Sequence, residues 1–194
     1  MGLFSRRTSD DAGSSATHAY LHQAAMDLVP RAHGSHASWT AQVETNYPSA
    51  MDAFRAVLPA VTDLEQLRGE SRALSEVAAV ESNRGTADPQ LATLIDQTYR
   101  AMESDWNTVA RSCGMLLFFP DENVAEPASM TASEDRDRKS RSELAAARFE
   151  GWWAQDHSEL LPSGTPTARE KYEAELLRIG AALGRSYSPT QGNF

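Results

Sequence analysis

Histidines are the residues of this sequence whose type and spacing best suit metal chemistry. Four of the five lie within nineteen residues, at His18, His22, His33 and His36. His18 and His22 are four apart and would share one face of a helix, and a loop that folds back would add the other two. Four imidazoles would suit Zn²⁺, with Ni²⁺ and Cu²⁺ as alternatives. The competing interpretation is that all four are polar residues of an exposed helix and loop.

Other catalytic chemistries find less support in the sequence. No Glu is followed by His three residues later, so the Glu-x-x-His motifs of carboxylate-bridged di-metal bundles are excluded. Cys113 would act as a nucleophile only beside a base, which the sequence does not place there, so a small core residue is expected instead. The motifs G-x-S-x-G, G-x-G-x-x-G and H-E-x-x-H and a phosphate loop do not occur. An enzyme is therefore not indicated.

Aromatic residues provide the best candidates for contacts with a partner. Trp152 and Trp153 are adjacent and would point about 100° apart on a helix, so one ring is expected in the core and the other under a loop or at an interface. Isolated apolar residues in the two non-periodic ends could dock on a neighbouring chain, although a frayed C-terminal end is the alternative. The predicted partner-binding residues are Leu3, Phe4, Trp152, Trp153, Tyr187 and Phe194.

The elements that would position the histidines lie near the N-terminus. Apolar residues three and four apart predict a short helix that begins after Ser15 and ends at Pro30. The sequence RAHGSHAS, residues 31–38, is then expected to be a loop. Under this interpretation His18 and His22 are helical, whereas His33 and His36 belong to the loop.

Further helices follow, with Pro and Gly residues between them. A helix from Pro48 is expected to kink or restart at Pro59 and to end near Gly85. Asp88 as N-cap and Pro89 as first helical residue open the most regular helical pattern of the chain, about five turns long.

The last two helices are predicted from capping patterns. Ser140 and Glu143 form a capping-box pattern for one helix, and Thr165 with Pro166 starts a final helix that ends at Gly184. The predicted fold class is all-α, an irregular bundle of five to seven helices with flexible N- and C-terminal arms.

The predicted division of the chain follows from these patterns. Residues 1–14 are expected to be a flexible N-terminal arm, residues 15–184 a helical domain, and residues 185–194 a C-terminal tail.

Composition limits the class of protein. The chain has 194 residues with 18 basic and 27 acidic side chains, a net charge of -9. This charge opposes nucleic-acid binding, because like charges repel. The start of the chain does not resemble a secretory signal, no apolar run is long enough to span a bilayer, and a single cysteine suits a reducing compartment, so a cytoplasmic protein is expected.

Charged side chains are expected mainly on solvated faces. The basic cluster near residue 138 is interleaved with acidic residues, which favours a solvated helix start over a binding patch. Its basic members are Arg136, Arg138, Lys139 and Arg141. Four acidic residues of the central helices are likewise expected on the wet face: Glu70, Glu76, Glu81 and Glu103.

These observations predict a non-enzymatic interaction or assembly protein. Its helical bundle would bind a protein partner or self-associate as a homo-oligomer through its terminal arms and exposed aromatic residues. One alternative is a metal-binding protein, a sensor or hydrolase, built on the four histidines. The other is a helical DNA-binding regulator, which the acidic charge opposes.

Overall fold

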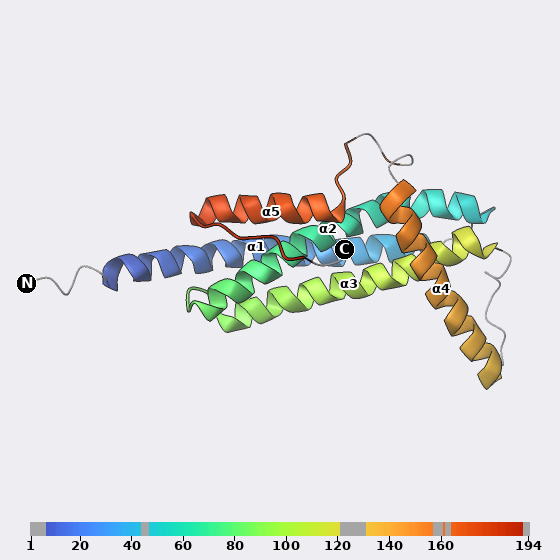
Figure 1. Ribbon diagram of the computed structural model, residues 1–194, viewed down its shortest axis with the longest axis horizontal. Helices are drawn as coiled ribbons and strands as arrows, with labels where there is room; N and C mark the ends of the chain where they lie inside the picture. Colours follow the sequence, from blue (N-terminus) through green and yellow to red (C-terminus); the bar gives the residue numbers. More distant parts are fainter. Residues whose placement is uncertain (1–6, 44–46, 121–130, 157–160, 162–163, 192–194) are drawn as a thin grey trace, which may run out of the picture. The chain divides into compact units, whose positions relative to one another are not determined.

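The computed structural model describes residues 7–43, 47–120, 131–156, 161 and 164–191. These residues form five α-helices and no strand, which confirms the all-α class (Figure 1). None of the helices described combines the length and the apolarity that a membrane crossing requires. The helices are α1 (Arg7–Val43), α2 (Ala50–Asn83), α3 (Pro89–Phe118), α4 (Ala132–Asp156) and α5 (Ala168–Leu183).

Helix α1 corrects the prediction of a helix end at Pro30 followed by a loop over 31–38. The helix is continuous for 37 residues, with Pro30 inside it and exposed. A proline inside a helix costs about 3 kcal/mol, whereas each buried large apolar side chain contributes about 1.5–3 kcal/mol. The buried stripe of α1 continues past Pro30 at intervals of three and four residues: Leu21, Ala25, Leu28, Ala32, Ser35 and Trp39. This periodicity outweighs the local breaking signals.

The ends of the helices differ from the predictions in part. Helix α1 already begins at Arg7, inside the range expected to be an arm. Helix α4 begins at Ala132, eight residues before Ser140, because Thr131 and Glu134 form a capping box there. The predicted start of α3 at Pro89 is confirmed, with the Asp88 carboxylate accepting from the Gln90 amide at 2.8 Å.

Close helix approaches explain two glycines inside helices. Helix α2 is continuous through Pro59 and contains Gly69, where a Cβ atom would collide with the backbone oxygen of Ala168. Gly114 of α3 lies in the same way against the backbone of Ala145 in α4. A side chain larger than hydrogen would force these helices apart.

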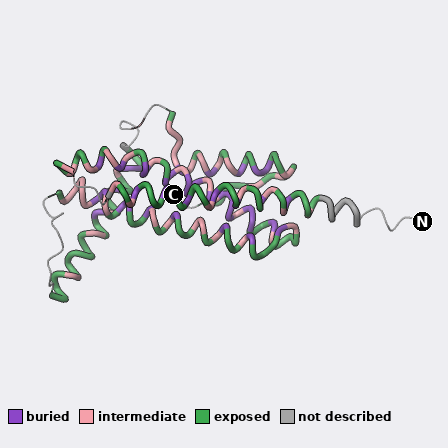
Figure 2. The backbone as a smooth tube through the Cα atoms, turned by 180° about the vertical axis from the view of Figure 1, so that it is seen from behind, coloured by how far each residue is buried: buried purple, intermediate pink, exposed green. Residues whose placement is uncertain are grey.

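The helices divide into two compact units, each with its own core. Unit 1 comprises Met1–Gly34, Leu64–Glu103 and Pro166–Phe194, and unit 2 comprises Ser35–Asp63 and Ser104–Thr165. Buried residues line the inner faces of the helices in both units (Figure 2). Large core residues of unit 1 include Leu21, Leu64, Ile95, Tyr172 and Ile179, and those of unit 2 include Phe54, Trp106, Val109, Phe149 and Trp153.

Candidate functional site

Helix α2 carries an unusual number of buried polar side chains in unit 1. They are Glu65, Arg68, Ser71, Ser75 and Glu81. Burying a polar group is unfavourable unless hydrogen bonds replace its contacts with water, and a buried charge needs a partner. The partners of these side chains therefore show which segments α2 holds.

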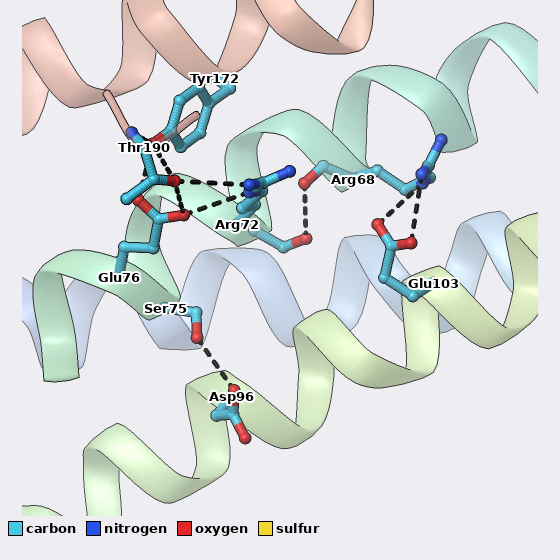
Figure 3. Close-up of polar contacts among 9 residues, drawn as sticks. Arg68, Arg72, Ser75, Glu76, Asp96, Glu103, Tyr172 and Thr190 are labelled. Atoms are coloured by element: carbon cyan, nitrogen blue, oxygen red, sulfur yellow. Dashed lines mark hydrogen bonds and ion pairs between the residues drawn. The ribbon is translucent and has the colours of Figure 1, made fainter. Parts of the chain in front are cut away.

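Two of these partners lie on α3. Arg68 donates from Nε and Nη2 to the two carboxylate oxygens of Glu103, at 3.0 and 3.1 Å (Figure 3). Two turns further along α2, the Ser75 hydroxyl donates to Asp96 at 3.2 Å. The bidentate geometry makes the first contact specific for arginine. These contacts join α2 to α3.

Helix α2 also contacts α5 and the segment that follows α5. The Tyr172 hydroxyl of α5 donates to Glu76 at 2.6 Å, and the backbone amide of Thr190 donates to the Tyr172 oxygen at 2.8 Å. The Thr190 hydroxyl donates to Glu76 at 2.8 Å (Figure 3). Arg72 donates to the same carboxylate at 3.1 Å and lies over the Tyr172 ring.

Glu81 is the second carboxylate of α2 that binds the segment after α5, and it has no exposed surface. Its carboxylate accepts from Arg84 at 2.7 Å, from the Thr86 hydroxyl at 2.7 Å and from the Tyr187 hydroxyl at 2.9 Å, and it also forms an ion pair with Arg185. A fully buried carboxylate requires such a set of donors. Two of the four donors come from the segment after α5.

We call this set of contacts the C-terminal clasp. It consists of Glu76 and Glu81 of α2, Tyr172 of α5 and the segment 185–191 that they hold. Burial raises the pKa of Tyr172, with the hydrogen bond to Glu76 adding to the effect, and burial raises the pKa of Tyr187. Both phenols therefore keep their protons at neutral pH and remain donors to the carboxylates.

The clasp corrects one expectation from the sequence and adds detail to another. Glu81 was expected on the wet face, but it is fully buried because Arg185 and Tyr187 neutralise and bind it. The segment 185–191, predicted to be part of a tail, lies against α2 and α5 of its own unit. Of the predicted partner-binding residues at the two ends, Leu3, Phe4 and Phe194 lie outside the described part of the chain.

The four histidines do not form one site. The rings of His18 and His22 are neighbours, with centroids 6.3 Å apart. Because α1 is a continuous helix, His33 lies about 16 Å further along it than His22, and no loop brings it back. His36 donates from Nδ1 to the Asp105 carboxylate at 2.9 Å in unit 2. Among the residues described, no three His, Cys, Asp or Glu side chains are grouped to hold a metal ion.

The paired tryptophans occupy different environments in unit 2. Trp153 is buried against Trp106 and Phe149, as expected for one of the two rings. Trp152 is half-buried and packs edge to face on Phe54, with ring centroids 5.7 Å apart. The Trp152 ring is therefore part of an aromatic cluster in unit 2.

Unit 2 also contains Cys113 and an open cavity. Burial raises the pKa of the Cys113 thiol to about 12, so it is not a nucleophile at neutral pH. The cavity, about 580 Å³ in volume, is lined among others by Tyr47, Arg111, Ser112 and Ser142. Among the described residues that line it there is no Asp, Glu, His or Cys.

The clasp residues could not be found by motif. Tyr172 lies on the buried apolar stripe of α5, and its hydroxyl joins Glu76 to Thr190. A tyrosine on an apolar stripe is the one local signal of a buried polar partner.

Comparisons with models of protein families, with curated proteins and with solved structures found no match to this chain.

Proposed function

We propose that the protein is a non-enzymatic interaction protein that self-associates by exchanging its C-terminal segment between copies. The observation that supports this proposal is the C-terminal clasp. Residues 185–191 have no regular secondary structure, and side-chain contacts with Glu76, Glu81 and Tyr172 hold them on α2 and α5. The same contacts would form unchanged with the segment of a second copy.

The hinge for such an exchange would be Gly184. It ends α5 in the left-handed conformation, with φ of 61°, and Arg185 donates from its amide to the Gly180 carbonyl. This turn directs the segment back onto its own unit. Extending the chain at Gly184 would instead send the segment to a neighbour, which is the usual route to domain-swapped dimers.

The balance between the two forms should depend on the hinge. A β-branched residue in the left-handed conformation costs about 1–2 kcal/mol, and the exchanged form would relieve this strain. Because each exchanged dimer contains two hinges, Gly184→Val should raise the dimer association constant roughly 30- to 900-fold, as measured by sedimentation velocity over a concentration series.

Two further variants test whether the clasp is responsible. Gly164 also has a positive φ, of 84°, but lies before α5, so Gly164→Val introduces comparable strain without directing the segment elsewhere. Adding Tyr187→Phe and Thr190→Val to Gly184→Val removes contacts that hold the segment and should abolish the gain. The proposal is wrong if Gly184→Val remains monomeric, or if its dimer persists without the Tyr187 and Thr190 contacts.

A further inference from the structure

The first half of α4 is a helix that buries none of its residues. From Ala132 to Leu144 every side chain is exposed or half-exposed (Figure 2). Contacts within the helix stabilise it: the Glu134 carboxylate accepts from the Thr131 amide at 2.7 Å, and Lys139 pairs with Asp135 at 2.8 Å. A helical segment that buries no face depends on such internal pairs or on a partner for its stability.

We propose that this half of α4 pairs in antiparallel orientation with the same half of α4 in a second copy of the chain. On the side of the helix opposite the buried Ala145 and Phe149, no residue from Ala132 to Leu144 is buried by the described part of the chain. Its residues recur at intervals of four and three, as in the seam of a two-helix coiled coil. These seam residues are Ser133, Asp137, Ser140 and Leu144.

Charged residues flank this seam in a self-complementary order. Glu134 and Arg141 lie on one side of it, and Arg136 and Glu143 lie on the other. When Asp137 faces Ser140 of the second copy, Arg136 comes to lie beside Glu143 of that copy. In the same register Glu134 lies beside Arg141, and the twofold symmetry repeats both pairs. All four flanking pairs then join opposite charges.

Neighbouring arrangements lack this complementarity. A shift of the antiparallel register by seven residues places Glu143 beside Glu143, and Arg141 beside Arg141, of the second copy. Parallel pairing places Arg136 beside Arg141 of the second copy, because flanking positions five residues apart meet in that orientation. The charges therefore select one register and one orientation, and they select a second copy as the occupant of this face.

The helix pair is independent of the clasp, since α4 belongs to unit 2 and the clasp to unit 1. Its contact area is small and its seam is largely polar, so the association should be weak and dependent on concentration. Sedimentation velocity of the full chain over a concentration series measures it directly. A chain that keeps its monomer mass of 21.2 kDa at every concentration would overturn the proposal.

Two single charge reversals provide the main test. Glu143→Arg places like charges beside Arg136 at two places in the pair, and Arg136→Glu does the same beside Glu143. Each variant should weaken self-association roughly 10- to 30-fold, since each replaces two attractive surface pairs by repulsive ones. An equimolar mixture of the two variants restores both opposite-charge pairs and should associate as tightly as the original chain. The double variant Arg136→Glu with Glu143→Arg should also regain association.

Controls separate this proposal from tail exchange. Glu150→Arg makes the same change on the same side of α4 but beyond the paired segment, and it should leave the association constant unchanged. Association that resists Glu143→Arg, or a mixture that fails to restore it, would overturn the helix pair. Association that is lost with Tyr187→Phe and Thr190→Val but indifferent to Glu143→Arg would support the proposed exchange and contradict the pairing of α4.

Discussion

The replacement of Gly69 by alanine tests the close approach of α2 and α5. A Cβ atom at Gly69 would collide with the backbone oxygen of Ala168 and crowd Tyr172. Gly34 of α1 is a matched control, because a Cβ atom there would meet no described atom within 4 Å. Both glycines are helical, so the two variants differ mainly in the space around the added methyl group.

Opposite effects on stability are expected from the same chemical change. Gly→Ala inside a helix stabilises by about 1 kcal/mol, and Gly34→Ala should realise this gain. At Gly69 the colliding atom belongs to the backbone of α5, which cannot rotate away, and overpacking of this kind costs roughly 1–3 kcal/mol. The free energies of unfolding of the two variants should therefore differ by about 1–3 kcal/mol, with Gly69→Ala the less stable.

Thermal and urea unfolding followed by circular dichroism measure this difference. For a chain of this size 1 kcal/mol corresponds to about 2–4 °C, so the two melting temperatures should lie roughly 2–12 °C apart. A Gly69→Ala variant as stable as Gly34→Ala would refute the reasoning, because α5 would then not pack on α2 at that point.

Other consequences of the structure can be tested with single variants. Tyr187→Phe removes one donor from buried Glu81 and should cost about 1–3 kcal/mol in urea unfolding, whereas Tyr99→Phe, whose hydroxyl has no partner among the described residues, should cost little. Cys113 should resist thiol reagents in the native state and react once the chain is unfolded, as followed by mass spectrometry. Hydrogen bonds from the Thr167 backbone and side chain lower the pKa of Glu170 below its ordinary 4.5. The stabilisation is complete above pH 4.5 and is lost as the pH falls through the lowered value, so melting temperatures of the original chain and Glu170→Ala should converge on acidification from neutral to about pH 3.

Capping residues and the spacing of apolar residues predict parts of α3 and α5 correctly. Helix α3 begins where Asp88 and Pro89 predict it, and its apolar pattern is buried, at Ile95, Met102 and Trp106 among other residues. Gly184 ends α5 in the left-handed conformation, as its position predicts. In these places the capping chemistry and the apolar periodicity agree with the packing.

Local signals fail where packing or a distant residue decides the outcome. Pro30 and Gly34 predict a loop, but the buried stripe of α1 continues through them to Trp39. The resulting helix separates His33 from His22, so the candidate metal site is not assembled. Glu81 resembles any acidic residue of an amphipathic helix, and its burial depends on Tyr187, which is 106 residues away in the sequence. No local pattern contains that information.

The division into two units has a consequence for any attempt to obtain them as separate fragments. Unit 1 combines three segments of the chain and unit 2 combines two, so the chain passes from one unit to the other four times. A single cut between α3 and α4 would leave unit 1 without α5 and unit 2 without α4. Neither unit can therefore be expressed as one continuous piece, and both must form from contacts between distant parts of the chain, which slows folding relative to a helical protein with mainly local contacts.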